Sequence, residues 1–368
     1  MKKVLYVFYA ASFMLGVVGG AYYTVSRDIV YKHVGLDYVF MSLLIASETV
    51  PGFFSVVGGM VGDVIGRRRM LLLGALSSIP LALIGFTSVE FIPLLILVYG
   101  VATSMAQPSI YGGLLHYTNS SGSAYSLMGV SNSLGWAVGG VLGGYMAEYL
   151  PYSTGMPLLG ILAFTGYMFI YASYPGEVAY PGAGLRDVVE GVRRVWMLFT
   201  VSLLAFTGTR FFFSNYVLVV RSMLGDPVLF GLVVNTIPAL TGALIWPLLG
   251  RASDKGNPSI LTATAILEYA LFIVLFLHIS DPLVVAILWA FPIYPLLEQG
   301  LVISISRKLP GKLQSLASGV FTTSISVAGA LILVLGGCFN NIAMIGYTSL
   351  FILFCSLGFL ILGTSRRK

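Results

Sequence analysis

The chain has 368 residues, of which 57% are hydrophobic and only 9% are charged, whereas roughly a quarter of the residues in a soluble domain are charged. This composition excludes a water-soluble fold and indicates an integral membrane protein. The formal net charge of +6 would suggest an acidic or nucleic-acid partner in a soluble protein. Here the distribution of basic residues between two membrane faces explains it, so no nucleic-acid partner is expected.

Apolar runs bounded by charges, glycine or proline predict twelve membrane-spanning helices. Long, mostly apolar runs such as 261–277 lack the alternation of a β-barrel strand. The run after Lys2 and Lys3 has an alternative interpretation as a secretory signal, but eleven similar runs follow it. The chain is therefore predicted to be an all-α integral membrane protein. The twelve predicted helices lie near 4–25, 38–61, 70–88, 91–115, 123–147, 155–173, 196–219, 228–249, 258–278, 282–304, 315–337 and 342–363.

The basic residues are unequally divided between the two predicted faces of the membrane. An even number of spans places both termini on one side, and sixteen of the 20 Lys and Arg residues fall there. Arg27, Lys32 and Arg221 fall on the opposite side, and Arg210 lies inside a span. Because cytoplasmic loops carry the excess of positive charge, both termini are predicted to be cytoplasmic and the protein to lie in the cytoplasmic membrane.

The longest connection on the side of the termini divides the chain into two halves. Its apolar and charged residues alternate at helical spacing over 185–195, which predicts an amphipathic helix at the membrane surface. The predicted domains are an N-terminal six-helix bundle over 1–178, a cytoplasmic linker over 179–195 and a C-terminal six-helix bundle over 196–368.

A short motif occurs once in each half. The segment 59–69, GMVGDVIGRRR, follows the second span, and 250–256, GRASDKG, follows the eighth at an offset of 191 residues. Two like halves indicate a transporter with its site near the midplane. The first segment resembles the signature loop of the major facilitator superfamily, and the second resembles its weaker copy. The resemblance implies the superfamily fold, two pseudo-symmetric six-helix bundles that work by alternating access.

In the superfamily this loop is understood to latch the two halves together on the cytoplasmic side. The resemblance implies that Asp63 meets the start of the eleventh span near Ser315, and that Asp254 meets the start of the fifth span near Ser121 to Ser123. An alternative explanation for part of the run Arg67 to Arg69 is that its positive charge keeps this loop on the cytoplasmic side, without any latch. The candidate latch residues are Gly59, Asp63, Gly66, Arg67, Arg68, Gly250 and Asp254.

The fifth span carries a glycine row. Residues 135–144, GWAVGGVLGG, resemble the exporter motif GxxxGPxxGG of the superfamily, with Gly140 in place of the proline. Gly135, Gly139 and Gly143 share one helical face, and close packing of a neighbouring helix explains that spacing equally well. The missing proline weakens the inference, so export is only slightly favoured over uptake.

Four ionisable residues lie inside predicted spans: Glu48, Arg210, Glu268 and Glu298. Each would cost about 2.5–3.5 kcal/mol if it faced lipid at the membrane centre, so an aqueous cavity or a partner is expected. Desolvation favours a neutral carboxyl group and a nearby arginine favours the charged form, which gives a physical basis for proton coupling.

The superfamily arrangement places the first, fourth, seventh and tenth spans around the cavity. It implies that Arg210 and Glu298 contact substrate or protons, together with Gln107 and Tyr294 on helical faces with the same polar pattern. Glu48 is expected either to contribute or to form a structural ion pair, and it could pair with Arg210. The ninth span, with Glu268, is peripheral.

The sequence thus predicts a secondary active transporter that moves a small organic solute by alternating access, coupled to protons. One alternative is an uptake symporter or uniporter for a sugar, carboxylate or amino acid, in which Arg210 pairs with an anionic group. An alternative of another class is a non-transporting receptor or scaffold. Catalytic, Walker and metal-binding motifs do not occur, so no enzyme activity, metal or cofactor is expected. The expected partners are the solute, protons and the bilayer, with the protein a monomer without an obligatory protein partner.

Overall fold

The computed structural model describes residues 2–117, 122–174, 185–291, 294–309 and 314–365, and these residues contain helices and no β-strand. The elements of the N-terminal half are α1 (Lys2–His33), α2 (Tyr38–Thr49), η1 (Val50–Phe53), α3 (Phe54–Ile65), α4 (Arg67–Leu76), α5 (Ser78–Leu83), η2 (Ile84–Phe86), η3 (Val89–Phe91), α6 (Ile92–Tyr117), α7 (Gly122–Tyr149) and α8 (Tyr152–Ser173). Those of the C-terminal half are α9 (Leu185–Leu224), α10 (Pro227–Gly231), the π-helical η4 (Leu232–Thr236), α11 (Ile237–Lys255), α12 (Pro258–His278), α13 (Pro282–Trp289), α14 (Tyr294–Lys308), α15 (Gln314–Gly336) and α16 (Ile342–Ser365).

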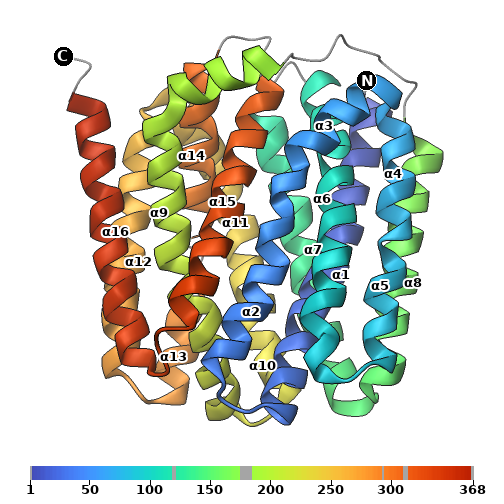
Figure 1. Cartoon of the computed structure of the whole chain (residues 1–368), viewed down its shortest axis with the longest axis vertical. Helices are drawn as coiled ribbons and strands as arrows, with labels where there is room; N and C mark the ends of the chain where they lie inside the picture. The colour runs from blue at the N-terminus through green and yellow to red at the C-terminus, as the bar shows by residue number, and fades with distance from the viewer. Residues whose placement is uncertain (1, 118–121, 175–184, 292–293, 310–313, 366–368) are drawn as a thin grey trace.

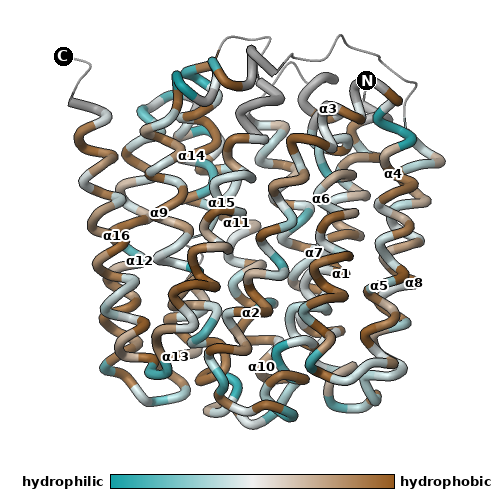
Figure 2. Tube along the Cα trace, viewed as in Figure 1, coloured by the Kyte–Doolittle hydropathy of each residue, from teal (hydrophilic) through white to brown (hydrophobic). Residues whose placement is uncertain are grey.

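These elements form twelve crossings between two ends of the molecule, as predicted. Both termini lie at one end, here called the terminal face, and the other end is called the opposite face (Figure 1). Apolar residues cover the length of the bundle, and polar residues gather mainly at the two ends (Figure 2). Among the described residues, eleven crossings are long and apolar enough to span a membrane. The twelfth, α7, is a 28-residue helix rich in glycine and serine, which lowers its hydropathy.

The helices of the two halves lie on different sides of the molecule, with α2 beside α15 where they meet (Figure 1). The residues expected to form a separate surface helix are the first turns of α9, a continuous helix of 40 residues that also forms the seventh crossing. This surface segment carries an exposed ion pair, Arg194 to Glu190 at 2.6 Å. The domain limits proposed above stay a prediction, since residues 175–184 lie outside the described part.

The signature segment is helical rather than a loop. Helix α3 continues to Ile65 and α4 begins at Arg67, so only Gly66 breaks the helix. Its φ of +99° is a left-handed conformation that favours glycine. The second copy forms the end of α11, which continues to Lys255. The expectation of two loops was therefore wrong, because one residue turns the chain in the first copy, and two residues, 256 and 257, turn it at the end of the second.

The glycine row of α7 packs directly on α1. A Cβ atom at Gly135, Gly139 or Gly143 would meet backbone atoms of Phe13, Val17 or Ala21 on α1. Small residues thus bring two helix backbones into contact, as they do in membrane proteins generally. This packing accounts for the row whatever the direction of transport.

Replacing Gly139 with alanine is expected to lower the free energy of unfolding by about 1–3 kcal/mol, the usual cost of overpacking. The added methyl group would have to displace the backbone of α1. Gly358→Ala in α16 is the matched control, because a Cβ there meets no atom within 4 Å. We expect the control to be neutral or up to about 1 kcal/mol more stable, since alanine favours helix. Thermal unfolding of purified protein in detergent measures both, and equal effects would contradict the packing argument.

A second glycine face of α7 contacts the other half. A Cβ at Gly140 would meet Gly231 and Asn235, and one at Gly144 would meet Pro227 and Val228. These partners belong to α10 and η4 of the C-terminal half. Proline at position 140 would not fit against them, which gives a steric reason for the departure from the exporter pattern.

Candidate functional site

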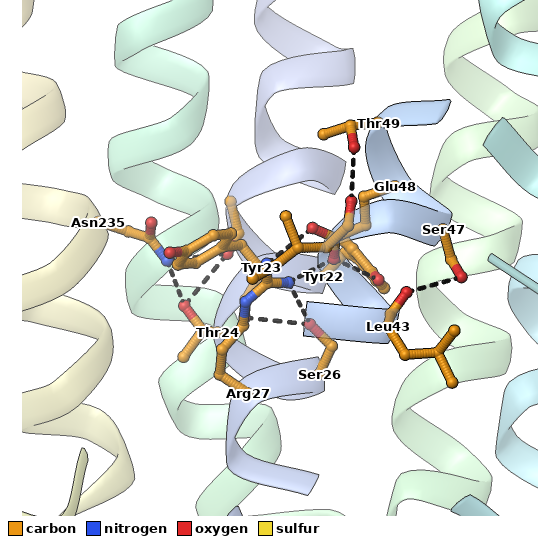
Figure 3. Close-up of polar contacts among 12 residues, drawn as sticks. Tyr22, Tyr23, Thr24, Ser26, Arg27, Leu43, Ser47, Glu48, Thr49 and Asn235 are labelled. Atoms are coloured by element: carbon orange, nitrogen blue, oxygen red, sulfur yellow. Dashed lines mark hydrogen bonds and ion pairs between the residues drawn. The ribbon is translucent and has the colours of Figure 1, made fainter. Parts of the chain in front are cut away.

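A buried ion pair joins α1 to α2. Arg27 Nη1 and Nη2 donate to Glu48 Oε1 and Oε2 at 2.5 and 2.7 Å, and Tyr22 Oη donates to the same carboxylate at 2.8 Å. The guanidinium also donates to Ser26 and lies 3.9 Å from the centre of the Tyr23 ring (Figure 3). Arg27 is 1% exposed and Glu48 is 20% exposed. We call these five residues the Arg27–Glu48 cluster.

This cluster corrects two expectations. Arg27 does not belong to a connection at the opposite face, because α1 continues past residue 25 to His33 and holds it inside the bundle. Glu48 pairs with Arg27 and not with Arg210. The physical reason is that a bidentate arginine–carboxylate pair makes burial of both charges tolerable, which hydropathy alone cannot reveal.

A second buried ion pair joins the two halves near the opposite face. Arg221 on α9 contacts Asp28 Oδ1 on α1 through Nε at 2.8 Å and Nη2 at 2.7 Å. Both side chains are 3% exposed. Lys32 contacts the other oxygen of Asp28 at 2.8 Å, and Arg221 also donates to the carbonyl of Gly225 at 2.7 Å. Arg221 and Lys32 were expected in connections, whereas both lie in helices.

Hydrogen bonds also join the two halves. Asn235 in η4 donates to Thr24 Oγ1 at 2.6 Å and to the Gly20 carbonyl at 3.3 Å (Figure 3). Thr236 donates to the Ala137 carbonyl of α7 at 2.8 Å. The two halves are therefore joined by an ion pair and several hydrogen bonds.

The predicted site residue Glu298 forms a third polar cluster. Tyr125 Oη on α7 donates to Glu298 Oε1 on α14 at 2.6 Å, and this bond also crosses between the halves. Tyr294, one turn before Glu298, interacts with the same carboxylate. The Tyr125 ring lies 6.5 Å from that of Tyr111 and 6.3 Å from that of Trp246. Tyr111, Tyr125, Trp246, Tyr294 and Glu298 are called the Glu298 cluster.

Arg210 lies near both the Arg27–Glu48 cluster and the Glu298 cluster. Its partly exposed guanidinium is 5.7 Å from the centre of the Phe206 ring and acts electrostatically on Tyr23 as well as on Tyr294 and Glu298. Among the described residues, no carboxylate lies within ion-pair distance of it. Arg210 thus contributes positive charge to the middle of the bundle without a fixed counter-ion there.

The remaining predicted residues are less closely connected. Gln107 on α6 is exposed, and it makes no hydrogen bond with a described residue. Glu268 on α12 is half-buried, and no ion pair joins it to a described residue. The structure therefore brings together Arg210, Tyr294 and Glu298, and leaves Gln107 and Glu268 outside their contacts.

The candidate latch is only partly described. The side chains of Asp63 and Asp254, and all of residue 315 beyond its helical backbone, lie outside the described part. Arg68 donates to the Tyr171 carbonyl at 2.9 Å, which is a contact within the N-terminal half. In the second copy, Gln299 donates to Ser253 at 2.9 Å within the C-terminal half. The proposed contacts between halves at Asp63 and Asp254 stay predictions.

The family of the chain follows from its sequence. The sequence profile of the Major Facilitator Superfamily matches residues 4–333. The chain belongs to the Major Facilitator Superfamily. No curated protein matches it in a sequence search. As a member of this superfamily with the helical fold described above, it is an integral membrane transporter for a small molecule.

Solved structures of other superfamily-type transporters share this fold. The crystal structure of the human organic anion transporter MFSD10 (TETRAN) has a TM-score of 0.72 at 15% identity, covering 98% of this chain and 99% of that one. The nucleoside transporter NupG has a TM-score of 0.71 at 14% identity, with coverage of 97% and 98%. A POT family transporter in complex with a thioalcohol-conjugated peptide gives 0.72 at 13%, with coverage of 98% and 95%. At these identities the likeness shows the fold alone.

Several residues of these clusters escaped the sequence analysis. Arg27, Asp28 and Arg221 lie near predicted span ends, where charges are ordinary. Tyr125 and Trp246 are aromatic residues in apolar runs, and nothing in their spacing marks them. The signal for Arg27 was Glu48 itself, since an unpaired carboxylate would be costly in the membrane.

Proposed function

We propose that this protein is a secondary active transporter that moves a small organic solute by alternating access, coupled to protons at Glu298. The observation that carries the proposal is the Tyr125–Glu298 hydrogen bond between the halves. An ionised carboxylate only accepts hydrogen bonds, whereas a protonated one also donates. Binding of a proton at Glu298 would therefore change a contact that joins the two halves.

Arg210 supports a more specific second candidate, a solute with an anionic group. Its guanidinium lies near the Glu298 cluster and has no carboxylate partner among the described residues. A carboxylate or phosphate of a solute would supply the missing counter-ion through charge-assisted bonds. The tyrosines of the cluster would then contact the rest of the solute. Direction of transport stays a prediction, and the packing role of the α7 glycines removes the main argument for export.

We expect Glu298→Gln to abolish the pH dependence of solute flux, with a drop of at least tenfold in gradient-driven uptake into proteoliposomes. Tyr125→Phe keeps the carboxylate and removes the bond between halves, so it should weaken the pH dependence without abolishing it. Glu268→Gln is the matched control, because that carboxyl group lies outside the cluster, and its pH dependence should stay unchanged. A thermal-shift screen of organic anions, nucleosides and peptides identifies the solute to be used. Unaltered pH dependence in Glu298→Gln would end the coupling proposal.

Access to Gln107 distinguishes a transporter from a non-transporting receptor. In a chain with Cys338 and Cys355 replaced by serine, Gln107→Cys should react with a membrane-impermeant thiol reagent from either face, in proportions that solute changes. Labelling from one face under every condition would favour the receptor or scaffold interpretation.

A further inference from the structure

Two opposite charges lie near each other in the middle of the bundle without forming an ion pair. Arg210 is on α9 and Glu298 is on α14, and both side chains are partly exposed. Arg210 acts electrostatically on Glu298, yet no ion pair joins these two described residues. The guanidinium instead lies 5.7 Å from the centre of the Phe206 ring, and the carboxylate accepts from Tyr125 at 2.6 Å. The two charges are therefore neighbours without direct contact.

The two buried arginine pairs of the bundle contrast with this arrangement. Arg27 and Arg221 are 1% and 3% exposed, and each contacts a carboxylate through two nitrogen atoms. Opposite charges attract strongly where water is scarce, so an ionisable group inside the membrane is expected to have a partner. Arg210 and Glu298 are partly exposed and can be reached by a small molecule. A solute that carries both charges would pair with the two residues at once, one at each end.

Aromatic rings and hydroxyl groups lie around the carboxylate of Glu298. Tyr125 donates to it, and the Tyr125 ring lies 6.5 Å from that of Tyr111 and 6.3 Å from that of Trp246. Tyr294, which is 45% exposed, interacts with the same carboxylate. The faces of tyrosine and tryptophan rings attract cations, and a carboxylate pairs with an ammonium group through charge-assisted hydrogen bonds. The Glu298 cluster thus suits the cationic end of a solute.

Further aromatic rings lie beside both charges. The hydroxyl group of Tyr269 on α12 is within electrostatic range of Arg210 and of Glu298. The Tyr269 ring lies 5.3 Å from the ring of Phe213, which follows Arg210 by one turn of α9. The Phe213 ring lies 5.6 Å from that of Trp289, and all three rings are partly exposed. Rings of this kind supply contact area for the apolar body of a ligand.

We propose that the solute of this transporter is a zwitterion with an aromatic body, either an amino acid or a short peptide. Its carboxylate would bind the guanidinium of Arg210 through paired hydrogen bonds. Its ammonium group would bind Glu298 beside the rings of Tyr111 and Tyr125, and its body would lie against Tyr269. The inference rests on the proposed function, because it concerns the solute of that site, and it adds a cationic group to the anionic one. A solute with the anionic group alone would need a proton on Glu298 in place of its own ammonium group.

The test compares ligands that share one body and differ only in charge. Phenylalanine is the zwitterion, its amide is the cation, its N-acetyl derivative is the anion, and N-acetylphenylalanine amide is neutral. The same four forms of the dipeptide alanyl-phenylalanine place the charges further apart. Binding to the detergent-purified protein is measured by titration calorimetry at neutral pH. We expect one of the two zwitterions to bind about tenfold more tightly, or better, than each of its singly charged forms, because a hydrogen bond to a charged group contributes that much.

Two variants assign each end of the solute to its residue. Arg210→Gln should weaken binding of the preferred zwitterion about tenfold and change the affinity of its amide by less than about twofold. Glu298→Gln should weaken the zwitterion similarly and leave the N-acetyl form unaffected. Glu268→Gln is the matched control, because it removes a half-buried carboxyl group of the same half outside the cluster, and every ligand should bind it normally. If a glutamine variant does not fold, Arg210→Lys and Glu298→Asp keep the charges and should keep the preference for the zwitterion.

Three results would overturn the inference. An N-acetyl form that binds as tightly as its zwitterion would show that a proton on Glu298, and not a solute ammonium group, supplies the positive charge. Absence of binding by both zwitterions would exclude the substrate class. An equal loss of zwitterion and amide affinity in Arg210→Gln would exclude the assigned orientation. Because binding needs no proton gradient, each of these results is distinguishable from a failure of proton coupling, which the flux of Glu298→Gln measures.

Discussion

Replacing Glu48 with glutamine is expected to lower the free energy of unfolding by about 3–5 kcal/mol, because it leaves a buried charge without its partner. The remaining Arg27 is 1% exposed, and a guanidinium cannot become neutral by losing its proton. Tyr22 and Ser26 would stay nearby but cannot neutralise it. The converse change, Arg27→Gln, should cost less, because Glu48 is partly exposed and becomes neutral on binding a proton.

This asymmetry is measured by thermal or denaturant unfolding of both variants in one detergent. The double variant Arg27→Met with Glu48→Leu serves as the control, since hydrophobic replacement of a buried pair is often neutral or stabilising. Acidic pH should restore part of the stability of Arg27→Gln and none of that of Glu48→Gln. Equal losses in the two single variants would show that the pair is more solvated than its geometry indicates.

Replacing Arg221 with glutamine is expected to have two effects. It removes the partner of the buried Asp28 and should cost about 3–5 kcal/mol of stability, reduced by whatever compensation Lys32 provides. It also removes the ion pair that joins α1 to α9 at the opposite face. The variant should therefore populate, more than the unaltered protein does, a conformation in which this face is open.

Opening is measured with a cysteine at Val228, which is packed beside Gly144 of α7. In the cysteine-free background, Arg221→Gln should increase the labelling rate from the opposite face at least threefold. Ser222→Ala is the control, because among the described residues its hydroxyl bonds only to the Val219 carbonyl of its own helix. A loss of stability without faster labelling would show that the ion pair supports the fold but does not keep this face closed.

Hydropathy and the residues that bound each apolar run were sufficient to predict the twelve crossings, because each span must satisfy its backbone within the helix and face lipid. Even α7, whose hydropathy is low, was found from its bounding residues. The same approach predicted that the first and seventh spans end near residues 25 and 219, whereas α1 and α9 continue to His33 and Leu224. Arg27, Asp28 and Arg221 looked like connection residues, since a charge is tolerated inside only when a partner from a distant segment meets it.

For the same reason, the sequence predicted only some of the residues of the candidate site. Arg210, Tyr294 and Glu298 lie near one another, as their helical faces indicated, because two of them share one helix and the family arrangement places the third opposite. Tyr125 could not be anticipated, since its contact with Glu298 joins residues 173 positions apart. Glu48 illustrates the limit most clearly: its need for a cation was predictable, but the identity of that cation was not.

The two glycine faces of α7 have a mechanical consequence. On one face the helix is pressed against α1 of its own half, and on the other it meets α10 and η4 with little side chain between the backbones. Interdigitated side chains would resist the sliding of one helix along another, whereas helix surfaces made of small residues offer less resistance. We therefore expect α7 to move with its own half, and the other half to shift along it only when the Asp28–Arg221 ion pair and the hydrogen bonds of Ala137 and Tyr125 across the interface have broken.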